Sequence, residues 1–198
     1  MKTLSTRILA EVAASPEAAP IRAKALLHLG RRAAVDQALS RLALRGALVR
    51  AGRGLYVRPV QTRFGPRTPS VDAVVNALGA ETGEILTPSG AAAANTLGLS
   101  TQVPVRTVYL TSGPNRRLRF GAQKVDLQHA PRWQLTFPGR PAGDVIRALA
   151  WFGRERGAEL TSLLKRTLSP EILQELSSAR GRMPTWMAEQ ISTLVARA

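Results

Sequence analysis

The feature that most constrains this chain is a series of three helix-period segments at its start. Leu4, Ile8 and Val12 recur at four-residue spacing, which places them on one face of a helix. A second apolar segment covers residues 21–29 and a third covers 31–45, and each is followed directly by a glycine. Glycine adopts the backbone conformation that ends helices, so the pattern predicts three short, separate helices.

Two β-prone runs follow the third segment within residues 48–57. They flank the tripeptide Gly52-Arg53-Gly54, which predicts a tight turn between two strands. Three helices and a hairpin in this order, with a tight turn between the second and third helices, predict a winged helix-turn-helix over residues 1–60. In such a domain the third helix enters the major groove of DNA.

The apolar stripe of the third helix decides which of its residues face outward. Val35, Leu39 and Leu42 predict the buried side, so Gln37 and Ser40 point away from it. Arginine precedes and flanks this face and also lies on or beside the hairpin. The predicted DNA-contacting residues are Arg31, Arg32, Gln37, Ser40 and Arg41 on the third helix, with Arg50, Arg53 and Arg58 on the wing.

The charge of the chain supports a polyanionic partner. The 28 basic and 13 acidic residues give a net charge of +15, and 24 of the basic residues are arginine. Residues 1–60 hold 11 of the basic residues and 3 of the acidic ones, so the excess is densest in the predicted DNA-binding domain. Charge alone leaves nucleic acid, an acidic membrane surface and an acidic protein as candidates.

The remainder of the chain predicts a larger α+β domain with a small, mostly antiparallel sheet and a helical C-terminus. Residues 61–69 are rich in proline and predict a linker, so this domain covers 70–198. Ser70 and Thr87 are expected as helix N-caps, with Pro88 opening the second of these helices. Strands are expected at 84–86, 103–110, 118–120, 125–127 and 133–137, and helices from 142 onward.

The sequence predicts no enzyme. The absence of cysteine excludes disulfides, thiolate nucleophiles and cysteine zinc sites. His28 and His129 lie in different predicted domains without a neighbouring carboxylate pair, and Asp72, Asp126 and Asp144 are too scattered to hold metal ions for nucleic-acid chemistry. We therefore expect no catalytic residue, no metal and no cofactor.

Membrane insertion is not expected either. No apolar run approaches the ~18 residues that a membrane-spanning helix needs. The first apolar stretch is interrupted by Arg7 and Glu11, which is untypical of a secretory signal. The pattern predicts a soluble, cytoplasmic protein.

Two features outside the first domain are candidate partner contacts. Arg116, Arg117 and Arg119 follow a Gly-Pro turn and can bind a second phosphate or an acidic partner, or form an ordinary solvated loop. Trp186 lies off the inward stripe of its helix, so it is either an anchor for a partner or a partly buried tryptophan.

Several strings resemble the AbiEi-type antitoxins. In the first domain they are residues 32–42 (Arg-Ala-Ala-Val-Asp-Gln-Ala-Leu-Ser-Arg-Leu), 45–46 and 52–56 (Gly-Arg-Gly-Leu-Tyr). In the second they are 89–104, 109–113 and 184–187, of which Leu-Gly-Leu-Ser-Thr-Gln-Val-Pro at 97–104 is the most specific. The resemblance implies the antitoxin of a type IV toxin–antitoxin pair, which represses its own promoter and has a nucleotidyltransferase-like toxin as partner.

An alternative interpretation is an RNA-binding or nucleic-acid-processing basic protein without a toxin partner. Its charge would fit, but aromatic residues for base stacking make up only 5% of the chain. The sequence identifies no dimer interface and no operator, so the oligomeric state stays open.

Overall fold

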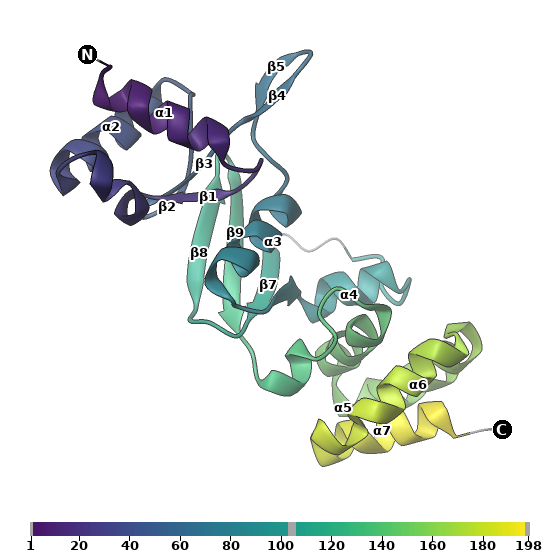
Figure 1. Cartoon of the computed structure of the whole chain (residues 1–198). Coiled ribbons are helices and arrows are strands. Elements are labelled where there is room, and N and C mark those ends of the chain that lie inside the picture. The colour runs from purple at the N-terminus through teal and green to yellow at the C-terminus, as the bar shows by residue number, and fades with distance from the viewer. Residues whose placement is uncertain (1, 103–105, 197–198) are drawn as a thin grey trace. The chain divides into compact units, whose positions relative to one another are not determined.

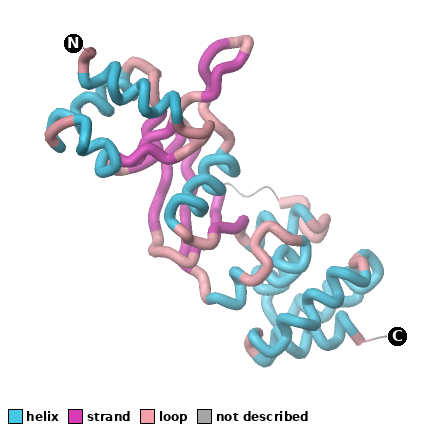
Figure 2. The backbone as a smooth tube through the Cα atoms, viewed as in Figure 1, coloured by secondary structure: helices cyan, strands magenta, loops and turns pink. Residues whose placement is uncertain are grey.

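The computed structural model describes residues 2–102 and 106–196 and has the predicted α+β composition, with small antiparallel sheets and a helical C-terminal region (Figures 1 and 2). The chain forms two compact units. The N-terminal unit comprises Met1–Glu84 and Arg116–Asp126, and the C-terminal unit comprises Ile85–Asn115 and Leu127–Ala198.

The N-terminal unit begins with helices and continues with short strands. Its elements are α1 (Leu4–Ala14), β1 (Pro20–Arg22), the 3₁₀ helix η1 (Ala23–Leu29), α2 (Arg32–Leu44), β2 (Val49–Gly52), β3 (Leu55–Val57), β4 (Val60–Thr62), β5 (Gly65–Arg67), α3 (Val71–Thr82), β8 (Arg116–Phe120) and the first part of β9 (Gln123–His129). Strands β1, β3 and β2 form an antiparallel sheet in that order, and β4 pairs with β5 as a separate hairpin.

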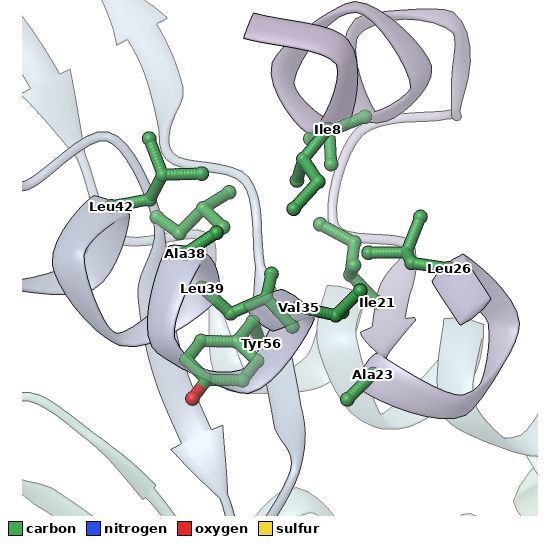
Figure 3. Packing of buried hydrophobic residues seen from close by; sticks show 11 residues of the cluster. Ile8, Ile21, Ala23, Leu26, Val35, Ala38, Leu39, Leu42 and Tyr56 are labelled. Carbon is green, nitrogen blue, oxygen red and sulfur yellow. The ribbon is translucent and has the colours of Figure 1, made fainter. Parts of the chain in front are cut away.

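The core of the N-terminal unit lies between α1, α2 and the β1-β3-β2 sheet. Ile8 from α1, Leu39 from α2 and Tyr56 from β3 come together there (Figure 3). The predicted stripe is confirmed, because Val35 and Leu39 are fully buried and Leu42 is 3% exposed. Leu39 packs into this core from α2, which leaves the opposite side of α2 for solvent.

The predicted helix over residues 21–29 is wrong in its first part and in its type. Pro20–Arg22 forms β1, in which Ile21 faces Tyr56 of β3, and only Ala23–Leu29 is helical, as the 3₁₀ helix η1. Ile21 is buried by this pairing with a strand thirty-five positions later in the chain. A long-range pairing therefore overrides the local helical pattern.

The stretch predicted as a linker has regular structure. Residues 60–67 form the β4–β5 hairpin, and α3 also belongs to the N-terminal unit, which extends to Glu84. An ion pair of 2.8 Å between Arg22 of β1 and Glu81 of α3 connects α3 with the β1-β3-β2 sheet of this unit. The division into compact units thus differs from the predicted 1–60, 61–69 and 70–198.

The C-terminal unit consists mainly of helices. Its elements are β6 (Leu86–Pro88), α4 (Gly90–Thr96), β7 (Thr107–Thr111), the last part of β9, the 3₁₀ helix η2 (Arg132–Leu135), α5 (Pro141–Thr167), α6 (Pro170–Ala179), the 3₁₀ helix η3 (Arg180–Arg182) and α7 (Thr185–Val195). In this unit the strand order is β6-β7-β9, with β6 antiparallel to β7. Helix α5 is interrupted at Gly153, where φ is 78°.

Three expectations for this unit are corrected. Thr87 and Pro88 belong to strand β6, and Ser89 takes the N-cap position of α4, because residues 86–88 pair with β7. The strand predicted at 133–137 is wrong, since Arg132–Leu135 forms η2 after Pro131. Of the strand predicted at 103–110, residues 103–105 lie outside the described residues, and β7 starts at Thr107.

Close helix contacts form the core of the C-terminal unit. An ideal Cβ built on Gly90 of α4 would overlap the backbone of Arg147 and lie 2.6 Å from Cβ of Trp151, both on α5. Only glycine permits this approach, since the overlapped atom is a main-chain carbonyl that cannot swing aside. Of the helices in the described residues, none has the length and hydropathy needed to cross a membrane.

Candidate nucleic-acid interface

The outward face of α2 carries the residues predicted to contact DNA. Gln37, Ser40 and Arg41 are exposed on this face, and Arg31 is exposed at the N-cap position with Arg32 directly after it. The buried stripe of Val35, Leu39 and Leu42 lies on the other side, so the helical period places these polar groups together as predicted.

Short-range interactions order two of these arginines. Nε of Arg32 donates to Oδ2 of Asp36 at 2.8 Å, one helical turn away. Arg41 donates from Nη2 to Oε1 of Gln37 at 3.4 Å. Both are exposed i,i+4 pairs, so they restrict the side chains without adding much stability.

The turn between β2 and β3 presents Arg53 to solvent. Arg53 and Gly54 form the turn, and Gly54 has φ of 67°, a conformation that favours glycine. Nearer the body of the unit, Nε of Arg50 donates to the carbonyl oxygen of Gly52 at 3.4 Å. The predicted hairpin is therefore present, with one arginine at its tip and one on its first strand.

A cavity of about 820 Å³ lies beside β2, and we call it the basic cavity. Arg50, Arg67 and Arg119 are its charged lining residues, and none of the three forms an ion pair within the described part of the chain. The described lining contains no carboxylate. The full lining is Ser40, Ala43, Leu44, Gly46, Leu48, Val49, Arg50, Gly52, Pro59, Pro66, Arg67, Thr68, Arg119 and Gly121.

The same local geometry holds two of the three arginines. Nε of Arg119 donates to the carbonyl oxygen of Gly121 at 3.1 Å, as Arg50 does to Gly52, so each arginine is bonded to the glycine two positions later. In both cases the bond uses Nε and leaves the terminal nitrogens of the guanidinium without a hydrogen-bond acceptor among the described residues. Those nitrogens can form the paired hydrogen bonds that phosphate accepts.

Sequence reasoning missed Arg67 and left Arg119 open between a second phosphate contact, an acidic partner and an ordinary solvated loop. Arg67 lies on β5, inside the segment that its prolines marked as a linker. The turn residues Arg63-Phe64-Gly65 between two short runs were the signal for a hairpin. Arg119 lies on β8, beside β2 within the N-terminal unit, which no local pattern could have indicated.

Three other predicted contacts are held by the protein itself. Arg58 is half-buried and donates from Nη1 to the carbonyl oxygen of Ala13 at 3.1 Å, near the end of α1. Arg116 makes two hydrogen bonds to Glu84, at 2.8 and 2.5 Å. Arg117 lies 2.6 Å from Asp126, whose hydrogen bond and charge raise the pKa of Arg117.

Trp186 is in the C-terminal unit and packs against other aromatic and aliphatic residues. Its ring meets Trp133 edge to face, with centroids 6.1 Å apart and planes at 88°. It is half-buried against the cluster around Leu149 and Met187. Trp186 thus belongs to the C-terminal unit, whereas the arginines of the basic cavity belong to the N-terminal unit.

Charge divides unevenly between the units. The N-terminal unit contains 17 basic and 7 acidic residues, a net charge of +10, and the C-terminal unit contains 11 and 6, a net charge of +5. The N-terminal unit is the shorter of the two. It combines the denser positive charge with the arginine-lined cavity.

The two histidines have local partners. His28 lies 2.9 Å from Glu11, and Nδ1 of His129 lies 2.9 Å from the carbonyl oxygen of Gly113. Among the described residues, no three histidine or carboxylate side chains are grouped as metal ligands would be. The arrangement in the N-terminal unit is suited to binding an anion rather than to holding a metal.

Comparison with known proteins identifies a family. No curated protein and no solved structure matches the chain. The model of DUF6088, a family of unknown function, matches residues 7–174, which cover most of both units. The chain therefore belongs to the DUF6088 family.

Proposed function

We propose that this protein is a transcriptional repressor that binds duplex DNA sequence-specifically through a winged helix-turn-helix in its N-terminal unit. The observation that carries the proposal is the basic cavity, which has three arginines, no carboxylate among its described lining residues, and Ser40 and Leu44 of α2 on one side. An arginine-lined surface beside an exposed helix is suited to a phosphate backbone.

The order of elements supports this fold. Helix α1, strand β1, helices η1 and α2 and the β2–β3 hairpin follow one another, and β1 completes the sheet beside β3. This order is typical of winged helix domains. In that fold α2 is the recognition helix and the β2–β3 turn with Arg53 is the wing.

The face of α2 fits the major groove of DNA. The groove is about 12 Å wide, which admits a helix of about 10–12 Å with its side chains. Ala33 and Ala34 are small and exposed, so the helix can approach the base edges closely. Gln37 can then pair with adenine and Arg41 with guanine, while Arg50, Arg67 and Arg119 bind phosphates.

The proposal extends to the antitoxin role that the AbiEi resemblance implies. The resembling strings lie in both units, including Gly-Arg-Gly-Leu-Tyr at 52–56 and Leu-Gly-Leu-Ser-Thr-Gln-Val-Pro at 97–104. We place the protein in the cytoplasm, acting on its own promoter and paired with a nucleotidyltransferase-like toxin. The exposed Trp151 and Leu163 of the C-terminal unit are apolar surface for protein contacts.

Fluorescence anisotropy tests the DNA-binding half. The probes are the duplex upstream of the gene, a scrambled duplex of the same length and a single-stranded RNA. We expect the upstream duplex to bind at least tenfold more tightly than the scrambled duplex at physiological salt. Equal affinity for all three would overturn the repressor proposal, and preference for RNA would favour the alternative of an RNA-binding protein.

A matched pair of triple variants locates the binding surface. Replacing Arg50, Arg67 and Arg119 with alanine removes three positive charges from the basic cavity. Replacing Lys165, Arg166 and Arg182, which are exposed in the C-terminal unit, removes three from elsewhere. We expect the first set to lower the salt slope of binding by about three, one for each phosphate that is no longer neutralised, and the second set to leave it unchanged.

The antitoxin half has a separate test. A nucleotidyltransferase-like gene beside the gene for this protein is expressed alone and together with it. We expect arrested growth in the first case and normal growth in the second. Normal growth in both cases, or arrest in both, would refute the antitoxin role and leave the DNA-binding proposal standing.

A further inference from the structure

The β4–β5 hairpin has an unusual tip. Strand pairing places Thr62 opposite Gly65, so Arg63 and Phe64 form a two-residue turn. Oγ1 of Thr62 donates to the carbonyl oxygen of Gly65 at 2.8 Å and accepts from the backbone N–H of Phe64 at 3.2 Å. These bonds fix the turn without using the side chains of Arg63 or Phe64.

Phe64 is 86% exposed, which makes it the most exposed large apolar side chain in the described residues. The guanidinium carbon of Arg63 lies 4.7 Å from the centre of its ring. A phenylalanine that stays exposed contributes little of the folding free energy that its burial would provide. The position is therefore suited to binding something rather than to folding.

The surroundings of Phe64 are positively charged and continuous with the basic cavity. Arg63 is beside it, Arg67 lies three residues further along, and residues 60–67 contain no acidic residue. Arg67 is also a lining residue of the basic cavity. Three strand residues span about 10 Å, so the aromatic tip and a cavity arginine are close enough to contact the same short stretch of duplex.

We propose that the tip of the β4–β5 hairpin is a second DNA contact, in which Phe64 inserts between base pairs from the minor groove and Arg63 and Arg67 bind the flanking phosphates. The inference rests on the proposed function, because it adds a contact to the same duplex. Apolar side chains accompanied by arginine act as such wedges in other DNA-binding proteins. Charge complementarity favours DNA as the occupant over an apolar protein surface.

The edge of the hairpin also argues against a protein strand as occupant. Pro66 lies on β5, opposite Gln61 of β4. Proline has no backbone N–H, so it removes a donor that an added strand would need. The hairpin thus offers an aromatic tip and positive charge, but a poor edge for strand addition.

The test measures base unstacking directly. 2-Aminopurine replaces single adenines of the upstream duplex in turn, since its fluorescence rises when it loses stacking. We expect the wild-type protein to raise the signal about twofold or more at one step, and Phe64→Ala to abolish this rise and weaken binding roughly fivefold. Phe64→Leu, which keeps an apolar wedge, is expected to retain most of the signal.

The controls separate this inference from the proposed function. A double variant that replaces only Arg50 and Arg119, and keeps Arg67, reports phosphate binding in the basic cavity independently of the tip. Tight duplex binding with identical affinity and fluorescence for wild type and Phe64→Ala would overturn the wedge and leave the repressor proposal intact. Loss of binding to a toxin with unchanged DNA binding in Phe64→Ala would overturn it as well, whereas no duplex binding by the wild type would defeat both proposals.

Discussion

Each unit contains a group of glycines with a purpose of its own, although turn glycines with positive φ also occur in the C-terminal unit. In the N-terminal unit, Gly54 and Gly65 have positive φ, and a Cβ on either would meet nothing within 4 Å. In the C-terminal unit, a Cβ on Gly90, Gly143 or Gly157 would overlap atoms of a neighbouring segment. The first pair makes turns that carry arginine or phenylalanine to the surface, and the second set lets segments pack closely.

The one arginine that is buried among the described residues lies in the C-terminal unit. The side chain of Arg147 in the C-terminal unit is fully buried and bonded to Asp144 at 2.7 Å. Burial lowers the pKa of Arg147, while the hydrogen bond and charge of Asp144 oppose that shift. Arg50, Arg53 and Arg119 of the N-terminal unit are exposed instead. Replacing the buried arginine is thus expected to change stability, and replacing these exposed arginines is expected to change binding.

The largest expected effect is from removing the buried guanidinium. Arg147→Ala leaves Asp144 without its partner and opens a cavity, so we expect a loss of about 3–5 kcal/mol in the free energy of unfolding. Urea titration followed by tryptophan fluorescence measures this in the C-terminal unit, which contains all three tryptophans. Arg154→Ala is the control, since its 3.5 Å pair with Glu189 is exposed and contributes under about 1 kcal/mol. Equal losses of unfolding free energy in Arg147→Ala and Arg154→Ala would show that the buried ion pair stabilises the protein no more than the exposed one.

The second-largest effect is expected from alanine and asparagine substitutions at one glycine of each unit. Gly90→Ala forces a methyl group against the carbonyl of Arg147, with an expected cost of about 2–3 kcal/mol. Gly90→Asn is expected to cost more, because its side chain is larger. Gly54→Ala is expected to cost about 1–2 kcal/mol through its backbone conformation alone, and Gly54→Asn less, because asparagine tolerates positive φ.

Alanine is therefore expected to cost less stability than asparagine at Gly90, and more than asparagine at Gly54. Chemical denaturation followed by circular dichroism gives the four values. Gly181→Ala serves as the control, because a Cβ there meets nothing within 4 Å and its φ is not positive. If the asparagine variant is less stable than the alanine variant at Gly54 as well as at Gly90, steric contact rather than backbone conformation dominates in both units.

Sequence reasoning succeeded where the determinants are local. The stripe Val35, Leu39 and Leu42 and the turn at Gly54 were predicted, because helical period and turn chemistry act over a few residues. The order of helices and hairpin in the N-terminal unit has the same origin. The exposed face of α2 follows directly from that stripe.

Sequence reasoning failed where contacts between distant segments determine the local structure. Ile21 joined a strand because β3 pairs with it, and residues 132–135 became helical where Trp133 packs on Trp186. The site was incomplete for the same reason. Arg119 contributes to the basic cavity from β8, and no local sequence pattern predicts that β8 lies beside β2.

Two arginines of the N-terminal unit separate binding from folding. Arg53 is exposed at the β2–β3 turn, so Arg53→Ala is expected to weaken DNA binding by about 1 kcal/mol, close to fivefold, without loss of stability. Arg58 bonds the carbonyl of Ala13 at the end of α1, so Arg58→Ala is expected to cost about 1 kcal/mol of stability with little change in affinity. Anisotropy measures the DNA affinity of both variants and urea titration measures their stability. Weaker binding by Arg58→Ala together with lower stability of Arg53→Ala would contradict this docking geometry.

The smallest expected effect concerns a negative charge on α2, the helix that we propose enters the major groove. Asp36 is the only acidic residue of α2 and holds Arg32 at 2.8 Å. Asp36→Asn frees Arg32 and removes a charge that repels phosphate, so we expect DNA affinity to rise about two- to threefold at low salt and the gain to shrink as salt screens it. Stability should change by less than about 0.5 kcal/mol, because the pair is exposed. Glu189→Gln frees Arg154 in the C-terminal unit in the same way, and an equal gain there would mean that net charge, rather than the face of α2, governs binding.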